Sequence, residues 1–131
     1  MRKIIFISML MMVSVLLAAC GNSATATPAA TSSQPVNIKV ETNPNPPVMG
    51  DLEVILNVTD ATGKPIEGAT VDVSADHIDM TGMDMSGAAT EQGDGKYAIN
   101  ANFSMSGNWR LKVYVRKEGL DYSEEIDLSI Q

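Results

Sequence analysis

Cysteine is almost absent from this 131-residue chain, in which Cys20 is the only one. A single cysteine excludes an intramolecular disulfide and any site built from several thiolates, so the fold must be held by packing alone. Histidine is equally scarce, with His77 alone. The chain also contains no G-x-S-x-G sequence and no glycine-rich phosphate loop, which are common signatures of catalytic sites. We therefore predict a protein that is not an enzyme.

Basic residues are few. All sixteen acidic residues, but only seven of the nine basic ones, follow Cys20, which leaves that part of the chain with a net charge of −9. A domain this acidic lacks the basic patch that phosphate backbones require, so nucleic acid is not an expected partner. Any affinity for a membrane must come from an attached lipid rather than from charge.

The chain's one long apolar run is short for a membrane span. It extends from Ile4 to Leu17, about 14 residues, after Arg2 and Lys3 and before the residues Ala18-Ala19-Cys20-Gly21. A spanning helix needs roughly 20 residues, whereas an exported signal needs fewer. We predict a bacterial lipoprotein signal peptide over residues 1–19, with Cys20 as the lipid-attachment residue; a transmembrane anchor is the alternative. The protein would then be lipid-anchored at the cell membrane and face the extracytoplasmic side.

The segment that follows lacks both charges and large apolar side chains. Residues 21–35 consist of Gly, Asn, Ser, Ala, Thr, Pro and Gln. Such a composition cannot bury enough surface to offset the entropy lost on ordering. We predict that residues 20–35 form the lipidated cysteine and a flexible linker, and that residues 36–131 form one folded domain.

Strand-like alternation of apolar and polar residues dominates that domain, and no stretch shows a helical period. The alternating runs are residues 36–40, 52–58, 69–73, 97–103, 109–115 and 126–130. Turn-forming sequences rich in Gly, Pro, Asn and Asp separate most of them. The pattern predicts an all-β domain, an immunoglobulin-like antiparallel β-sandwich of about six or seven strands, with a small barrel as the alternative. Aromatic residues are scarce, and we expect Trp109 to fill the core.

One segment, residues 76–87, departs from this pattern. It contains His77 and three of the five methionines that follow Cys20, namely Met80, Met83 and Met85. Thioether sulfur is a soft ligand that suits Cu(I), and imidazole suits copper as well. A turn at Gly82 would bring the three methionines together. Met105 would join them if its turn lies at the same end of the domain. We therefore predict a Cu(I) site, whose candidate ligands are Met80, Met83, Met85, Met105 and His77.

Core packing is the competing interpretation of the same residues. Methionine is a flexible gap-filler, and Met83 and Met85 would share one face of an extended strand. Met105 has the parity of Phe103, which favours packing over ligation. His77 falls on the inward parity, where a lone histidine is more often hydrogen-bonded at the rim of the core than bound to metal.

The aspartates of the segment offer a second alternative. Asp76, Asp79 and Asp84 could bind a hard cation through their carboxylates. Their spacing does not match the D-x-[DN]-x-[DN]-G loop of calcium-binding proteins. The sequence therefore favours a soft metal over a hard one.

Several motifs together resemble a known family. They are G-K-P-I-E-G-A-T-V at residues 63–71, M-x-x-M-x-M at 80–85, and F-S-M-S-G-N-W at 103–109. From about Ile38 to Val115 the chain resembles the YtkA-like domain, which is related to FixH-like proteins. The resemblance implies a β-sandwich in an extracytoplasmic protein, often a lipoprotein, and associates the methionine-rich segment with copper or cytochrome oxidase handling. It carries over to the four candidate methionines, whereas His77 matches no defined family position.

Two functional hypotheses follow. In the first, the domain is a tethered module that captures Cu(I) and passes it to a partner, such as an oxidase or another copper acceptor. In the second, it is a structural or protein-interaction domain of the cell envelope, and its methionines form an adaptable apolar contact. Methionine substitutions should weaken copper binding only under the first hypothesis.

Overall fold

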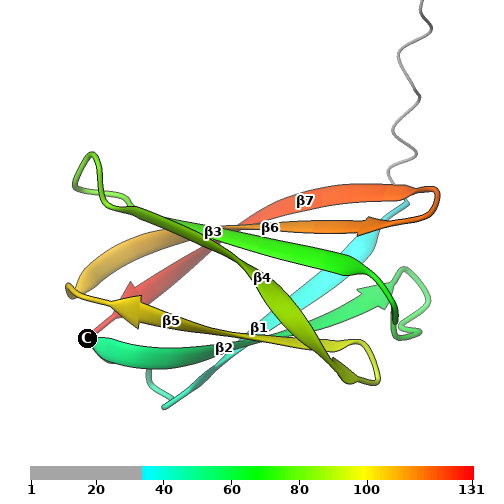
Figure 1. The fold of residues 1–131 in the computed structure, drawn as a ribbon, viewed down its shortest axis with the longest axis horizontal. Coiled ribbons are helices and arrows are strands. Elements are labelled where there is room, and N and C mark those ends of the chain that lie inside the picture. The colour runs from blue at the N-terminus through cyan, green and yellow to red at the C-terminus, as the bar shows by residue number, and fades with distance from the viewer. Residues whose placement is uncertain (1–33) are drawn as a thin grey trace, which may run out of the picture. The chain divides into compact units, whose positions relative to one another are not determined.

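Seven β-strands and no helix make up the part of the chain that the computed structural model describes, residues 34–131 (Figure 1). The predicted signal peptide, Cys20 and the linker as far as residue 33 lie outside the described residues. None of the described residues belongs to a helix long and apolar enough to cross a membrane. The strands are β1 (Val36–Asn43), β2 (Gly50–Asp60), β3 (Thr70–His77), β4 (Asp84–Gly93), β5 (Lys96–Phe103), β6 (Gly107–Lys117) and β7 (Leu120–Ile130).

All strand pairs are antiparallel, and together they form one sheet in the order β1-β2-β5-β4-β3-β6-β7. β4 joins the two halves of this sheet, since residues 84–89 pair with β3 and residues 90–93 pair with β5. The sheet folds back on itself at β4. As a result, β1, β2 and β5 face β3, β6 and β7 (Figure 1). The all-β antiparallel fold predicted from the sequence is confirmed.

The core lies between the two halves of the sheet and follows the predicted alternation. The inward residues of β2 and β6 are almost fully buried, and the largest buried side chains are those of Trp109, Tyr97 and Phe103. Burying one such apolar side chain contributes about 1.5–3 kcal/mol, so these strands supply much of the stability. The expected core position of Trp109 is confirmed.

β4 is a strand that the sequence pattern did not predict, and it begins within the segment at residues 76–87 that departs from the alternation. That segment contains the end of β3, a turn at residues 78–83, and the start of β4. The inward positions of β4 are Met85, Gly87 and Ala89, which are too small or too flexible to produce a recognisable apolar alternation. At Gly87 a Cβ atom would lie 2.9 Å from Cδ1 of Ile99, so a larger residue there would require the end of the Ile99 side chain to shift. A strand selected for small side chains is hard to detect from its sequence.

Two side chains order the turns at the end where β2 finishes. The Tyr97 hydroxyl donates to the carbonyl of Ile66 (2.8 Å) and accepts from the amide of Ala69 (3.1 Å), which ties the β2–β3 connection to β5. Asp60 Oδ1 accepts from the hydroxyl of Thr62 (2.6 Å) and from the amides of Thr62 and Lys64 (2.8 and 3.0 Å). The Asp60 carboxylate therefore organises the tight turn that follows β2.

The turn at Asp60 predicts a pH dependence. The hydrogen bond from the Thr62 hydroxyl, followed by that from the Lys64 amide, holds the pKa of Asp60 below its usual value. Because the folded-state pKa is the lower one, this stabilisation is complete above the unfolded value of about 3.9 and is lost as the pH falls through the folded value. We expect Asp60→Asn to lower the melting temperature at pH 7, and the difference from wild type to shrink below about pH 4.

Thermal unfolding followed by circular dichroism at several pH values measures this difference. Glu118→Gln, an equal change of charge in the exposed β6–β7 turn, is the control and should leave the wild-type profile unchanged. A constant difference between Asp60→Asn and wild type from pH 7 to pH 3 would contradict the assignment.

Candidate functional site

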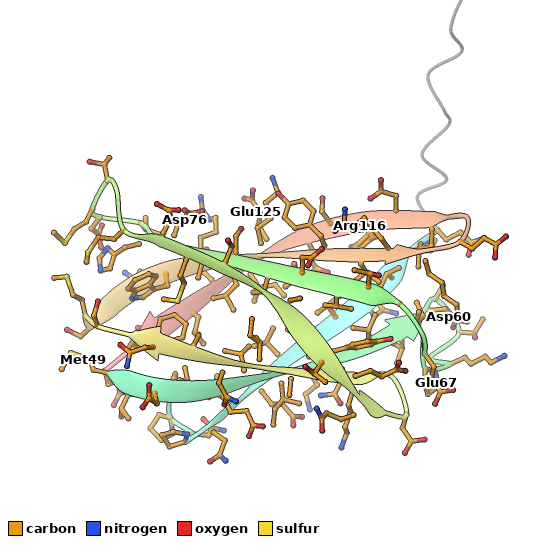
Figure 2. All side chains as sticks on the ribbon, viewed as in Figure 1. Met49, Asp60, Glu67, Asp76, Arg116 and Glu125 are labelled. Atoms are coloured by element: carbon orange, nitrogen blue, oxygen red, sulfur yellow. The ribbon has the colours of Figure 1, made fainter. Side chains whose placement is uncertain are left out.

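The five methionines that follow Cys20 all lie at one end of the described domain. Met49 directly precedes β2, Met80 and Met83 lie in the β3–β4 turn, Met85 is the second residue of β4, and Met105 lies in the β5–β6 turn. We call this region the methionine end: residues 44–49, 78–83 and 104–106, with the strand ends that adjoin them. Figure 2 shows Met49 at this end, with Asp60 and Glu67 at the opposite end.

Strand register explains why residues so far apart in sequence meet here. The first residue of β2, Gly50, pairs with the last residue of β5, Phe103. The last residue of β3, His77, pairs with Trp109 near the start of β6. The β1–β2, β3–β4 and β5–β6 connections are therefore neighbours, and the condition for Met105 to approach the β3–β4 turn is met at the level of the backbone.

The methionines differ in exposure. Met49 and Met80 are 53% and 44% exposed, respectively. Met83 and Met85 are half-buried and pack against the hydrophobic core, as the packing interpretation predicts. Met85 also lines a cavity of about 300 Å³ between β4 and β5. Met105 is half-buried in its turn.

His77 is buried, with 8% of its surface exposed, and both of its ring nitrogens have backbone partners. Nδ1 accepts from the amide of Asp79 (3.2 Å), so the proton resides on Nε2, which donates to the carbonyl of Ser106 (3.2 Å). This is the hydrogen-bonded rim position that its parity predicts. Ligation of a metal by His77 would require one of these two bonds to break.

The position of His77 connects the two methionine-bearing turns. Its amide donates to the carbonyl of Met83 (3.0 Å), while its ring holds Ser106, the neighbour of Met105. The Nε1–H of Trp109 donates to the Met105 carbonyl (3.2 Å), and the Trp109 ring stacks edge-on against His77 at 5.0 Å. His77 and Trp109 thus fix the backbone of Met105 close to that of Met83.

A hard-cation site finds no support. Within residues 34–131 no group of three or more His, Cys, Asp or Glu side chains is placed to hold a metal ion, although Asp76, Asp79 and Asp84 are all among these residues. The thioethers of the five methionines are the other potential metal donors at this end.

Met49 is not among the predicted ligands, and Met80, the next methionine along the chain, follows it 31 positions later. The Met49 amide donates to the carbonyl of Gln131 (2.9 Å), beside the end of β7. The sequence does place Met49 just before a strongly alternating run, and therefore near the start of a strand. To predict that Met49 lies beside the other methionines, one would also need to know that β2 begins where β5 ends.

The profile of the YtkA-like family matches residues 30–114, more than half of the chain. The chain belongs to the YtkA-like family. The resemblance noted from its motifs is confirmed, and the matched region of this YtkA-like chain runs from before β1 into β6 and includes all five methionines. Comparisons with curated proteins and with solved structures give no significant match.

Proposed function

We propose that this YtkA-like protein is a lipid-anchored extracytoplasmic protein that binds Cu(I) at its methionine end. One observation carries the metal assignment: five methionines that are dispersed over 57 residues of sequence gather where three connections meet. Core packing explains Met83 and Met85 in part, but it does not explain why Met49 and Met80 remain exposed at the same end.

Thioether sulfur fits this role chemically. Cu(I) prefers soft ligands, and methionine needs no deprotonation and cannot be lost to a disulfide outside the cell. Met83, Met85 and Met105 would provide the inner ligands, and the exposed Met80 would capture the ion. His77 would act through its hydrogen bonds, as a residue that positions the turns of Met83 and Met105. Several weak ligands would also permit release to an acceptor such as an oxidase.

The direction of β1 suits a tethered module. β1 begins at Val36, opposite Asp60, and therefore at the end of the domain away from the methionines. A lipid on Cys20 would be connected through this far end, so the methionine end would be accessible to partners. The wild-type protein should incorporate a labelled fatty acid, and replacement of Cys20 by serine should abolish that incorporation. If the Cys20→Ser variant incorporates as much label as wild type, the lipid assignment is wrong.

A competition titration with a chromogenic Cu(I) chelator tests the metal site. Soluble protein from residue 21 onward should bind one equivalent of Cu(I), and the triple variant Met80→Leu/Met83→Leu/Met85→Leu should bind at least about tenfold more weakly. Leucine removes the sulfur and nearly preserves the volume, so the fold should survive. Near-ultraviolet circular dichroism and the melting temperature provide the control for folding.

The second candidate is an interaction domain that binds no metal. It is favoured by the packing of Met83 and Met85 against the core and by the exposed apolar side chains at the same end. In that case wild type and triple variant would compete equally poorly for Cu(I). Met105→Leu alone would then also leave the titration unchanged.

A further inference from the structure

We propose that the methionine end carries a docking surface for a protein partner whose own surface has an apolar recess bordered by lysine or arginine side chains. Four large apolar side chains in residues 34–131 are strongly exposed: Val48 (40%), Met49 (53%), Ile78 (44%) and Met80 (44%). Two belong to the β1–β2 connection and two to the β3–β4 turn, so all four lie at this end. We call these four residues the docking tip.

Backbone hydrogen bonds link the two halves of the docking tip. The amide of Ile78 donates to the carbonyl of Asn108 (2.9 Å), and Asn108 pairs with Ser129 in β7. Two residues further on, the carbonyl of Gln131 accepts from the amide of Met49. The path from Ile78 to Met49 thus makes three steps between neighbouring backbone segments, from β3 to β6, from β6 to β7, and from β7 to the β1–β2 connection. At roughly 4.8 Å for each step, the two halves of the docking tip lie about 15 Å apart, a span that one protein partner can cover.

The docking tip has an acidic border. Asp51, Asp76, Asp79 and Asp84 are exposed and lie within a few residues of its members. Arg110 faces Asp76 across the β3–β6 pair, but its guanidinium is bonded to Asp127 (3.1 Å) on the outer face of the sheet. A partner with basic residues around an apolar recess complements this border, whereas a second copy of this chain or an anionic lipid surface would be repelled.

The opposite end provides an internal comparison. Lys64, Lys96 and Lys117 are interspersed with acids there, and none of the four strongly exposed apolar side chains lies there. Apolar exposure combined with acidity is therefore specific to the docking tip and does not follow from the net charge of the domain. Exposed methionine also adapts its shape to a partner. This inference goes beyond the proposed copper site, because docking requires no metal.

Fluorescence anisotropy with a labelled synthetic peptide of alternating leucine and lysine tests the proposal, with a Cu(I) chelator present throughout. A serine–lysine peptide of equal charge serves as the probe without apolar side chains. The apolar variant is Val48→Ser/Ile78→Ser, which leaves every methionine in place. The charge variant is Asp79→Asn/Asp84→Asn, and its control is Glu118→Gln/Asp121→Asn, an equal change of charge near the other end.

We expect wild type and the control variant to bind the leucine–lysine peptide at least about tenfold more tightly than the apolar and the charge variants do. The serine–lysine peptide should bind weakly to all four proteins. Three results would overturn the proposal: no binding by wild type, undiminished binding by the apolar variant, or an equal loss in the far-end control. Copper titration of the apolar variant separates the two proposals, since its Cu(I) affinity should remain that of wild type even if docking is lost.

Discussion

Replacement of Trp109 by alanine is expected to lower the free energy of unfolding by about 3–5 kcal/mol, which is a large part of the stability of a domain of this size. Trp109 is 2% exposed, stacks edge-on against Phe103 at 5.1 Å, and donates a hydrogen bond to the Met105 carbonyl. Alanine would leave a cavity between the halves of the sheet and leave that carbonyl without its donor. The melting temperature should fall by roughly 20 °C.

Tyr114→Ala is the matched control for this prediction, because Tyr114 lies on the same strand with its ring on the outer face, near the Lys112 ammonium at 5.4 Å. Its loss should cost about 1 kcal/mol or less. Chemical denaturation of both variants, analysed with a common slope, gives the comparison. Equal losses for the two variants would mean that Trp109 has no special place in the core.

Strong alternation is what made most strands predictable. The buried positions of β2 are all Val or Leu, those of β6 are Val, Leu and Trp109, and the extents of both strands were predicted to within a few residues. β7 was predicted only from Ile126 onward, although it begins at Leu120. The reason is Glu124, which is half-buried on the inward parity and accepts a hydrogen bond from the Tyr122 hydroxyl (3.3 Å), so the apolar pattern is broken.

The candidate site was predictable in composition but not in assembly. The methionines of residues 80–85 and the inward direction of His77 could be inferred from local spacing and parity. The partner of the His77 ring, Ser106, lies 29 residues away, and only the pairing of β3 with β6 brings the two together. Met49 reaches the site through the pairing of β2 with β5. Long-range register of this kind leaves no local trace in a single sequence.

Gly107→Ala should destabilise the domain by about 2–4 kcal/mol and separate the two methionine-bearing turns. Gly107 has a φ of +127°, which side chains rarely adopt, and a Cβ atom there would lie 2.8 Å from Nε2 of His77. The ring must move, and its hydrogen bond to Ser106 would break. In nitrogen NMR spectra the His77 ring should lose the signature of a proton fixed on Nε2.

Gly63→Ala isolates the backbone contribution to that loss, because Gly63 has a φ of +84° and an added Cβ there has no atom within 4 Å. Gly63→Ala should lower the free energy of unfolding by about 1–2 kcal/mol and leave the His77 spectrum unchanged.

His77→Ala completes a double-mutant cycle with Gly107→Ala. Once the His77 ring is absent, the methyl group added at position 107 has nothing to displace. The double variant should therefore be more stable than the sum of the two single losses implies. Strictly additive losses would show that a methyl group at position 107 does not displace the His77 ring.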